Sequence, residues 1–222
     1  MKMSEPTRTE LYEAIVEGDV ASAADATQTL IDAGLSADEI LDGSVVPAMD
    51  EVGRLFDEGE YFVPELLMAS KATQIAMGLL NPMMISAGVE KIGCVVIGTV
   101  KGDMHDIGKN LVAAMLEGAG FEVIDLGVNV APEKFVEAVK ARGGAKTFVA
   151  LSALLTTTTP QMKATIELLE KEGLAETTKT LVGGAPVTAE FAASIGADGY
   201  SDGANACVAL AKRLLAEWND AV

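Results

Sequence analysis

Hydrophobic and polar positions follow two different patterns along the chain. Up to about residue 88, the apolar residues fall in helical patterns only. From about residue 89 onward, short apolar runs alternate with helical stretches, which is typical of a parallel sheet with helices on both faces. The patterns predict two domains, a helical bundle at 1–88 and an α/β domain at 89–222.

The first part predicts four helices with short connections, and therefore an antiparallel bundle. They are expected at residues 5–17, 20–33, 37–55 and 64–81. Ser36 and Glu39 have the spacing of a capping box before the third helix. Pro47 lies inside that helix, so a kink or an offset start is expected there. Residues 84–91 are the expected hinge, because they form the only break between the two patterns.

The second part predicts a doubly wound, five-stranded parallel sheet with flavodoxin-like (Rossmann-like) topology. Its strands are expected at residues 92–97, 121–126, 147–153, 180–183 and 199–201. The first run, IGCVVI, has no alternation of polar and apolar positions, which is typical of a strand covered on both faces. Helices are expected between the strands and after the last one, at 204–218.

Composition narrows the classes of function. Half of the 222 residues are hydrophobic and 22% are charged, so a packed core is expected. The net charge of −17 disfavours nucleic acid, whose phosphates would be repelled. We expect a cytoplasmic protein without a membrane segment, because the chain shows no signal peptide and no run of about 18 apolar residues. The two cysteines are interpreted as small hydrophobic residues rather than a disulfide.

The single histidine of the chain, His105, lies in the loop between the first expected strand and the next helix. Loops at this edge of an open α/β sheet are where such folds bind ligands. One ring nitrogen could bind a metal while the other donates to Asp103, two residues earlier. No second histidine exists and neither cysteine is at ligand spacing. A metal at His105 must therefore bring its own equatorial ligands, as a tetrapyrrole does.

The same loop resembles a known motif. Asp103, His105 and Gly108 match the D-x-H-x-x-G pattern of cobalamin-binding domains. The longer form DMHDIGKN is similar to methionine synthase and to the corrinoid proteins of methyltransferase systems. The resemblance implies that cobalamin binds with its benzimidazole displaced and with His105 on the cobalt, and that the loaded state carries methylcobalamin. A lone surface or core histidine is the alternative.

Two further motifs of these families follow in the expected order. Ser152 and Leu154 match the S-x-L motif that lines the channel for the nucleotide tail, and Gly183-Gly184 match the paired glycine. Thr158 falls where methionine synthase has a serine that hydrogen-bonds the aspartate behind the histidine, although residues 156–159 could be only a helix start. The other cofactor contacts implied by the resemblance are Gly102, Met104, Asp106, Ile107, Thr156, Tyr200 and Ser201.

Residues 49–67 resemble the helical module that precedes the cobalamin domain in the same families. There, large apolar residues cover the upper face of the cobalt, and by position in the motif Phe56 and Val63 are the covering pair. The second position is commonly leucine, so valine implies a looser cover. The alternative is that both side chains fill the core of the bundle. If they do cover the cobalt, the two domains must separate before a methyl donor can react.

The resemblance implies a methyl carrier. Its partners would be a substrate-specific methyltransferase, a second methyltransferase that serves the methyl acceptor, and a reductive activase. Two alternatives are a cobalamin-dependent regulator or light sensor, for which no DNA-binding segment is visible, and the cobalamin subunit of a mutase, which seldom carries this helical module. No acid, base or nucleophile of a substrate pocket can be identified, so no catalytic residue is assigned. The chain would act only with its partners, and the sequence does not indicate the methyl donor or acceptor.

Overall fold

The computed structural model describes residues 5–87 and 91–220, which form two compact units. One unit comprises Met1–Ile92 with Ala114–Phe121, and the other comprises Gly93–Ala113 with Glu122–Val222. The predicted domain boundary between residues 88 and 89 lies outside the described residues and stays a prediction. Residues 84–87 of the expected hinge belong to a helix, and residues 88–90 are not described.

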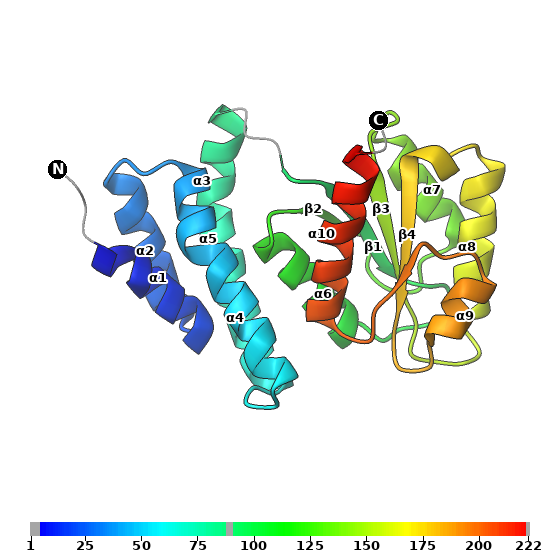
Figure 1. Cartoon of the computed structure of the whole chain (residues 1–222), viewed down its shortest axis with the longest axis horizontal. Coiled ribbons are helices and arrows are strands. Elements are labelled where there is room, and N and C mark those ends of the chain that lie inside the picture. Colours follow the sequence, from blue (N-terminus) through cyan, green and yellow to red (C-terminus); the bar gives the residue numbers. More distant parts are fainter. Residues whose placement is uncertain (1–4, 88–90, 221–222) are drawn as a thin grey trace. The chain divides into compact units, whose positions relative to one another are not determined.

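The N-terminal part is helical, as predicted (Figure 1). Its α-helices are α1 (Glu5–Glu17), α2 (Val20–Asp32), α3 (Ala37–Ile40), α4 (Val46–Asp57) and α5 (Val63–Ala87). The predicted capping box is present: the Ser36 hydroxyl accepts from the Glu39 N–H, and the Glu39 carboxylate accepts from the Ser36 N–H. This reciprocal pair satisfies two backbone donors at the start of α3.

The third predicted helix is divided into α3, a π-helical segment (Leu41–Val45) and α4. The Val46 N–H donates to the carbonyl of Leu41, five residues earlier. Pro47 has no N–H to donate, and it lies in the first turn of α4, where none is needed. The offset start expected at Pro47 is therefore confirmed.

Helix α5 is longer than the sequence predicted. It was expected to end at residue 81, before Pro82, yet it continues to Ala87 with the proline inside it. Met77, Leu80 and Met84 keep the helical spacing across Pro82 and are all buried. The packing of this apolar face outweighs the backbone hydrogen bond that the proline removes.

The C-terminal part contains the predicted five-stranded sheet. The strands are β1 (Cys94–Thr99), β2 (Glu122–Asp125), β3 (Thr147–Ser152), β4 (Thr178–Gly183) and β5 (Gly199–Tyr200). All pairs are parallel, and the order β2-β1-β3-β4-β5 is the flavodoxin-like order. Every residue of β1 is buried, as its apolar run predicted, but the strand covers 94–99 rather than 92–97, and Ile92 is exposed.

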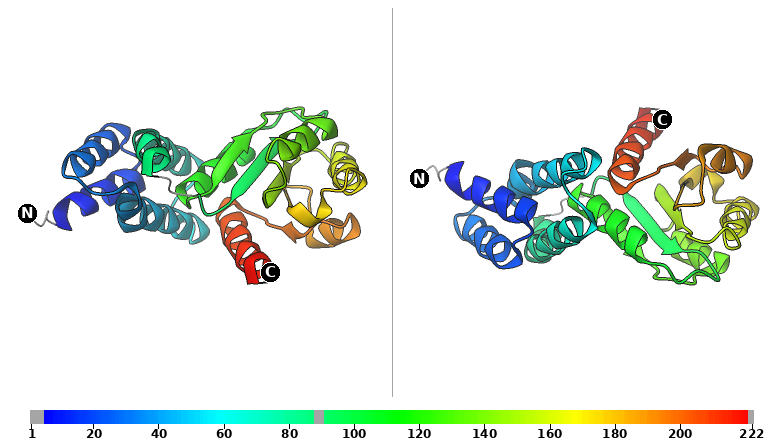
Figure 2. Two further views of the ribbon diagram at one scale, coloured as in Figure 1. Left: turned by 90° about the horizontal axis from the view of Figure 1, so that it is seen from above. Right: turned by 90° about the horizontal axis from the view of Figure 1, so that it is seen from below.

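Helices follow the strands in alternation: α6 (Ile107–Gly118), α7 (Pro132–Lys140), α8 (Pro160–Lys171), a 3-10 turn (Ala175–Thr177), α9 (Ala189–Ser194) and α10 (Ala204–Asp220). Figures 1 and 2 show α7 and α8 on one face of the sheet and α6 with α10 on the other. Val96, Val149 and Val182 of the strands share a buried core with Phe135 of α7 and Met162 of α8. No helix among the described residues has the length and hydropathy needed to cross a membrane.

Candidate functional site

The carboxyl ends of the strands bring the predicted motifs to one edge of the sheet. Thr99, the last residue of β1, pairs with Ser152 at the end of β3, and Ser152 pairs with Gly183 at the end of β4. Next to them, Val182 pairs with Tyr200 of β5. The loops that follow these four strands therefore begin side by side, and three of them carry the three motifs.

His105 lies in the loop between β1 and α6. The Thr99 hydroxyl donates to the carbonyl of His105 over 2.8 Å, which holds the loop against the end of β1. Gly102 has a φ of +85°, in the left-handed region that favours glycine. The His105 side chain is 50% exposed, so the ring is accessible from solvent.

Asp103 is fully buried behind the ring and accepts five hydrogen bonds. Its Oδ1 accepts from the His105 backbone N–H at 3.1 Å and lies 2.6 Å from the ring Nδ1. Its Oδ2 accepts from the Leu154 and Leu155 N–H groups at 2.8 and 3.1 Å, and from the Thr158 hydroxyl at 2.8 Å. The hydrogen bond expected between Thr158 and Asp103 is confirmed.

The electrostatics of this cluster fix the state of the imidazole. Burial alone raises the pKa of Asp103, but the hydrogen bonds from His105, Leu154 and Thr158 outweigh it and hold that pKa well below its usual range. The carboxylate is therefore ionised at neutral pH, and its Oδ1 accepts a hydrogen bond from the Nδ1–H of the His105 ring. The other ring nitrogen, Nε2, then keeps its lone pair for a metal.

Apolar side chains flank the exposed imidazole. Met104 and Ile107 are 66% and 61% exposed, and Leu154 and Leu155 are also exposed. Large apolar residues rarely gather on a surface without covering a partner or ligand. No group of three or more histidine, cysteine, aspartate or glutamate side chains among the described residues could hold a metal ion. One accessible nitrogen with an apolar surround fits a metal that is carried in a large, flat, apolar ring.

Close contacts within the chain itself explain why glycine is needed in the Gly183-Gly184 pair. A Cβ on Gly184 would lie 2.0 Å from the Ala153 carbonyl oxygen, and its φ is +125°. A Cβ on Gly183 would lie 3.1 Å from the Ser201 carbonyl oxygen. Gly184 is therefore required by the close approach of the loops after β3 and β4, whatever ligand lies beyond them.

The other predicted residues are spread over this edge and the helical part. Tyr200 is the last residue of β5, and the loops or helix starts that follow β1, β3 and β5 contain Asp106, Gly108, Thr156 and Ser201. Phe56 lies near the end of α4 and is half-buried, whereas Val63 begins α5 and is 40% exposed. Neither of these two is a fully buried residue of the helical part, and their covering role stays a prediction.

Two polar contacts beside the histidine loop were not predicted, one that links α6 to β2 and one that holds the loop itself. Lys109 is buried, and its Nζ lies 2.5 Å from Asp125 Oδ2 and 2.5 Å from Asn110 Oδ1. Asn129, in the loop after β2, hydrogen-bonds Gly102. The burial of Lys109 could have been predicted from the sequence, because Lys109 occupies the same helix face as the buried Ala113 and Leu116. For Asn129 the only signal was the residue type itself.

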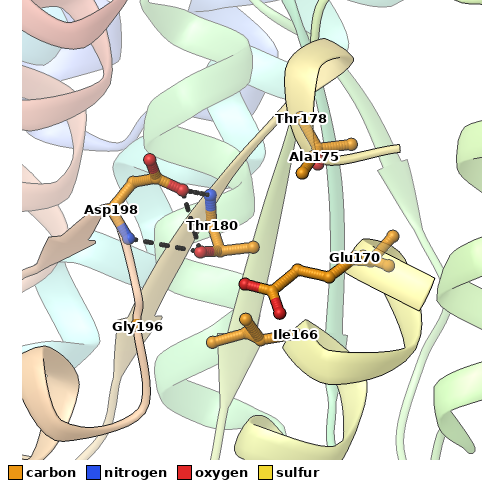
Figure 3. Close-up of a pocket in the computed structure, with 8 residues that line it drawn as sticks. Ile166, Glu170, Ala175, Thr178, Thr180, Gly196 and Asp198 are labelled. Atoms are coloured by element: carbon orange, nitrogen blue, oxygen red, sulfur yellow. Dashed lines mark hydrogen bonds between the residues drawn. The ribbon is translucent and has the colours of Figure 1, made fainter. Parts of the chain in front are cut away.

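A small pocket of about 140 Å³ lies elsewhere, where α8 and the 196–198 loop meet the start of β4 (Figure 3). Asp198 in this pocket accepts from the Thr180 N–H and hydroxyl and pairs with Lys179. Thr178 lies at the amino end of β4, so the pocket is not on the edge that carries His105.

Comparisons with known proteins agree with this geometry. Two family models, both described as a B12 binding domain, match residues 93–211 and 7–81. Dimethylamine corrinoid protein 1 of Methanosarcina acetivorans is 45% identical over 183 residues, which cover 82% of this chain and 85% of that protein.

Two solved structures are similar over almost the whole chain. A cobalamin-binding protein from Desulfitobacterium hafniense has a TM-score of 0.75 at 33% identity, covering 93% of this chain and 97% of that one. The methanol:cobalamin methyltransferase complex from Methanosarcina barkeri has a TM-score of 0.82 at 28% identity, covering 96% of this chain and 81% of that one. With an accessible imidazole at the predicted edge and matches of this extent, the chain belongs to the B12-binding corrinoid proteins.

Proposed function

We propose that the chain is a methyl carrier that binds cobalamin with the benzimidazole displaced and His105 as the lower ligand of the cobalt. Cobalamin, when bound, supplies a cobalt centre that can accept a methyl group and release it again. The observation that carries the proposal is the Asp103 to His105 pair. The buried carboxylate holds the Nδ1 proton, and the half-exposed ring presents Nε2 to the outside.

The chain's own residues have three tasks in this proposal. Asp103 and Thr158 orient the ring and keep its tautomer, because the Asp103 carboxylate accepts from the ring Nδ1 and from the Thr158 hydroxyl. Gly102, Met104, Asp106, Ile107 and Gly108 contact the cofactor around His105. Ser152, Leu154, Thr156, Gly183, Gly184, Tyr200 and Ser201 form the channel for its nucleotide tail, where small side chains and hydroxyl groups suit a buried heteroaromatic base.

The remaining parts of the proposal concern partners. A substrate-specific methyltransferase loads the carrier, a second methyltransferase unloads it onto an acceptor, and a reductive activase restores it after oxidation. Related proteins are named for dimethylamine and methanol. A small methylated compound is therefore the class of donor that we propose. Phe56 and Val63 are proposed to cover the bound cofactor between transfers, by analogy with the same helical module in relatives.

Isotope labelling tests the ligand assignment directly, because the chain has a single histidine. The protein is produced with 15N-histidine, reconstituted with unlabelled cobalamin and reduced to the cobalt(II) form. Electron paramagnetic resonance then resolves the splitting from the axial nitrogen. Coordination by His105 gives a doublet in the labelled protein and a triplet in the unlabelled one.

Two outcomes would contradict the assignment. A triplet that is unchanged by the label means that the benzimidazole is still on the cobalt. Failure of the wild-type chain to bind cobalamin refutes the carrier role altogether. His105→Ala is the control, since it removes the labelled nitrogen and must abolish the doublet.

A further inference from the structure

Asn129 has an unusual backbone conformation in the loop between β2 and α7. Its φ is +54°, and it is the one residue other than glycine with a positive φ in the part of the chain that the structure describes. The left-handed region is unfavourable for residues with a Cβ, and asparagine is among the few that adopt it routinely. A residue held in this region indicates a constraint from its surroundings.

The contacts of Asn129 supply that constraint. Its side-chain Oδ1 accepts from the Gly102 N–H over 2.8 Å, and its own N–H donates to the Asp103 carbonyl over 2.9 Å. The first bond also fixes the orientation of the amide, because only the oxygen can accept from an N–H. Asn129 therefore binds the first residue of the D-x-H motif, Asp103, and the residue before it, Gly102, from the side of β2.

The loop that carries Asn129 is itself held in place. The Thr99 N–H donates to the Gly127 carbonyl at 2.9 Å, and the Val130 N–H donates to the Thr99 carbonyl at 2.9 Å. At the start of the loop, Asp125 pairs with the buried Lys109 of α6. The loop that contains Asn129 is thus fixed to β1 and α6. The hydrogen bonds of Asn129 therefore hold the histidine loop at a defined position relative to β2.

We propose that Asn129 is a positioning residue for His105, an inference that rests on the proposed function. The carboxylate of Asp103 is held from β3 by Leu154, Leu155 and Thr158. Its backbone is held from β2 by Asn129. The peptide between Gly102 and Asp103 is held within the loop, because the Asp103 N–H donates to the Val100 carbonyl. Without Asn129, the peptide groups before and after it would lose their partner from the side of β2 and could rotate, and the ring would no longer keep a single direction.

Three variants separate the hydrogen bond from the backbone strain. Asn129→Gly removes the side-chain acceptor and relieves the strain, Asn129→Ala removes the acceptor and keeps the strain, and Asn129→Asp keeps both the acceptor and the tolerance for this φ. Thr178→Val is the matched control, because it removes the hydrogen bond from a buried hydroxyl to the Leu174 carbonyl at the opposite end of the sheet.

The first measurement uses the protein without cofactor. We expect amide hydrogen exchange at Gly102 to be about tenfold faster in Asn129→Gly and Asn129→Ala, as for the loss of one net hydrogen bond. Asn129→Asp should exchange as the wild type does. The 15N shifts of the His105 ring should show a weaker Nδ1 to Asp103 hydrogen bond in the first two variants only. Unchanged exchange at Gly102 in Asn129→Gly would overturn the inference.

The second measurement uses the protein with cobalamin and 15N-histidine. The fraction of cobalt(II) that shows the histidine doublet should fall in Asn129→Gly and Asn129→Ala, return in Asn129→Asp and stay at the wild-type value in Thr178→Val. A fall of the same size in Thr178→Val, or no fall in either Asn129 variant, would overturn the positioning role. If wild-type protein lacks the doublet, the proposed function fails. The 15N shifts of the His105 ring in the cofactor-free protein then still decide whether Asn129 positions that ring.

Discussion

Asp103→Asn tests how the cluster behind His105 works, because it removes the charge without changing the size of the side chain. If the new amide nitrogen took the place of Oδ2, it would face three donors, the N–H groups of Leu154 and Leu155 and the hydroxyl of Thr158. In the place of Oδ1 it faces the His105 N–H and the ring Nδ1. The ring can adapt by carrying its proton on Nε2, which leaves a lone pair on Nδ1 to accept from the amide. The second orientation therefore costs less.

The cost follows from what this orientation leaves unpaired. The backbone N–H of His105 loses its acceptor, which costs about 1–3 kcal/mol. The three bonds to Oδ2 lose the strengthening by charge, roughly 1 kcal/mol each. The desolvation cost of the buried carboxylate also disappears and offsets part of this loss. We expect the free energy of unfolding to fall by about 2–4 kcal/mol.

The effect on the ligand should be larger than the effect on stability. In Asp103→Asn the ring Nδ1 accepts a hydrogen bond, so the proton of a neutral imidazole moves to Nε2. A protonated Nε2 has no lone pair for a metal. Most of the cobalt(II) protein should therefore lose the histidine splitting, although the fold is retained.

Trp218 provides the probe for stability. It is the only tryptophan of the chain, and its ring packs edge-on against Phe148 of β3 with centroids 5.7 Å apart. Its fluorescence therefore follows unfolding of the sheet in urea. Thr158→Val is the matched control, because it removes one donor and leaves the carboxylate, with an expected loss of about 1 kcal/mol and an unchanged tautomer. A loss below about 1 kcal/mol in Asp103→Asn, with the histidine splitting intact, would refute the reasoning.

The pH dependence of the same pair gives an independent check. The pKa of Asp103 lies below its ordinary value in the folded chain, so its ionised form stabilises the fold above the unfolded pKa of about 3.9. This contribution is lost as the pH falls from there toward the folded pKa. The difference in stability between the wild type and Asp103→Asn should therefore be constant near neutral pH and shrink below about pH 4. A difference that grows on acidification would contradict the assignment.

Two further substitutions test the tail channel and the covering pair. Gly184→Ala should lower the free energy of unfolding by roughly 3 kcal/mol or more, because its Cβ would lie 2.0 Å from the Ala153 carbonyl oxygen. Gly143→Ala is the control, since Gly143 has a φ of +64° but open space around it, and it should lose only about 1–2 kcal/mol in the same urea assay. Equal losses would show that the close approach is not what requires the glycine. Phe56→Ala should speed the photolysis of bound methylcobalamin with little change in cobalamin affinity, and unchanged rates in both Phe56→Ala and Val63→Ala would refute the covering role.

The parts of this molecule that depend on local pattern could be predicted, and those that depend on distant contacts could not. The apolar run of β1 specified a buried strand, and the loop after it specified the Asp103 to His105 pair, because both signals lie within a few residues. Helix α5 was predicted too short, since a proline usually ends a helix and only its buried face shows why this one continues. Asn129 was missed because its role depends on Gly102, which lies 27 residues earlier.

The same distinction explains how the histidine is held. A motif of six residues supplies the carboxylate and the imidazole. It cannot fix the direction of the ring by itself, because the groups that hold the carboxylate and the loop backbone belong to other segments of the chain. The direction comes from β3, through two N–H groups and the Thr158 hydroxyl, and from β2, through Asn129. A ligand fixed from two strands has little freedom to rearrange when a charge or a bond at its far nitrogen changes. A carrier that must return to the same state after each transfer needs that property, and the parallel order of the strands provides it by bringing both supports to one edge.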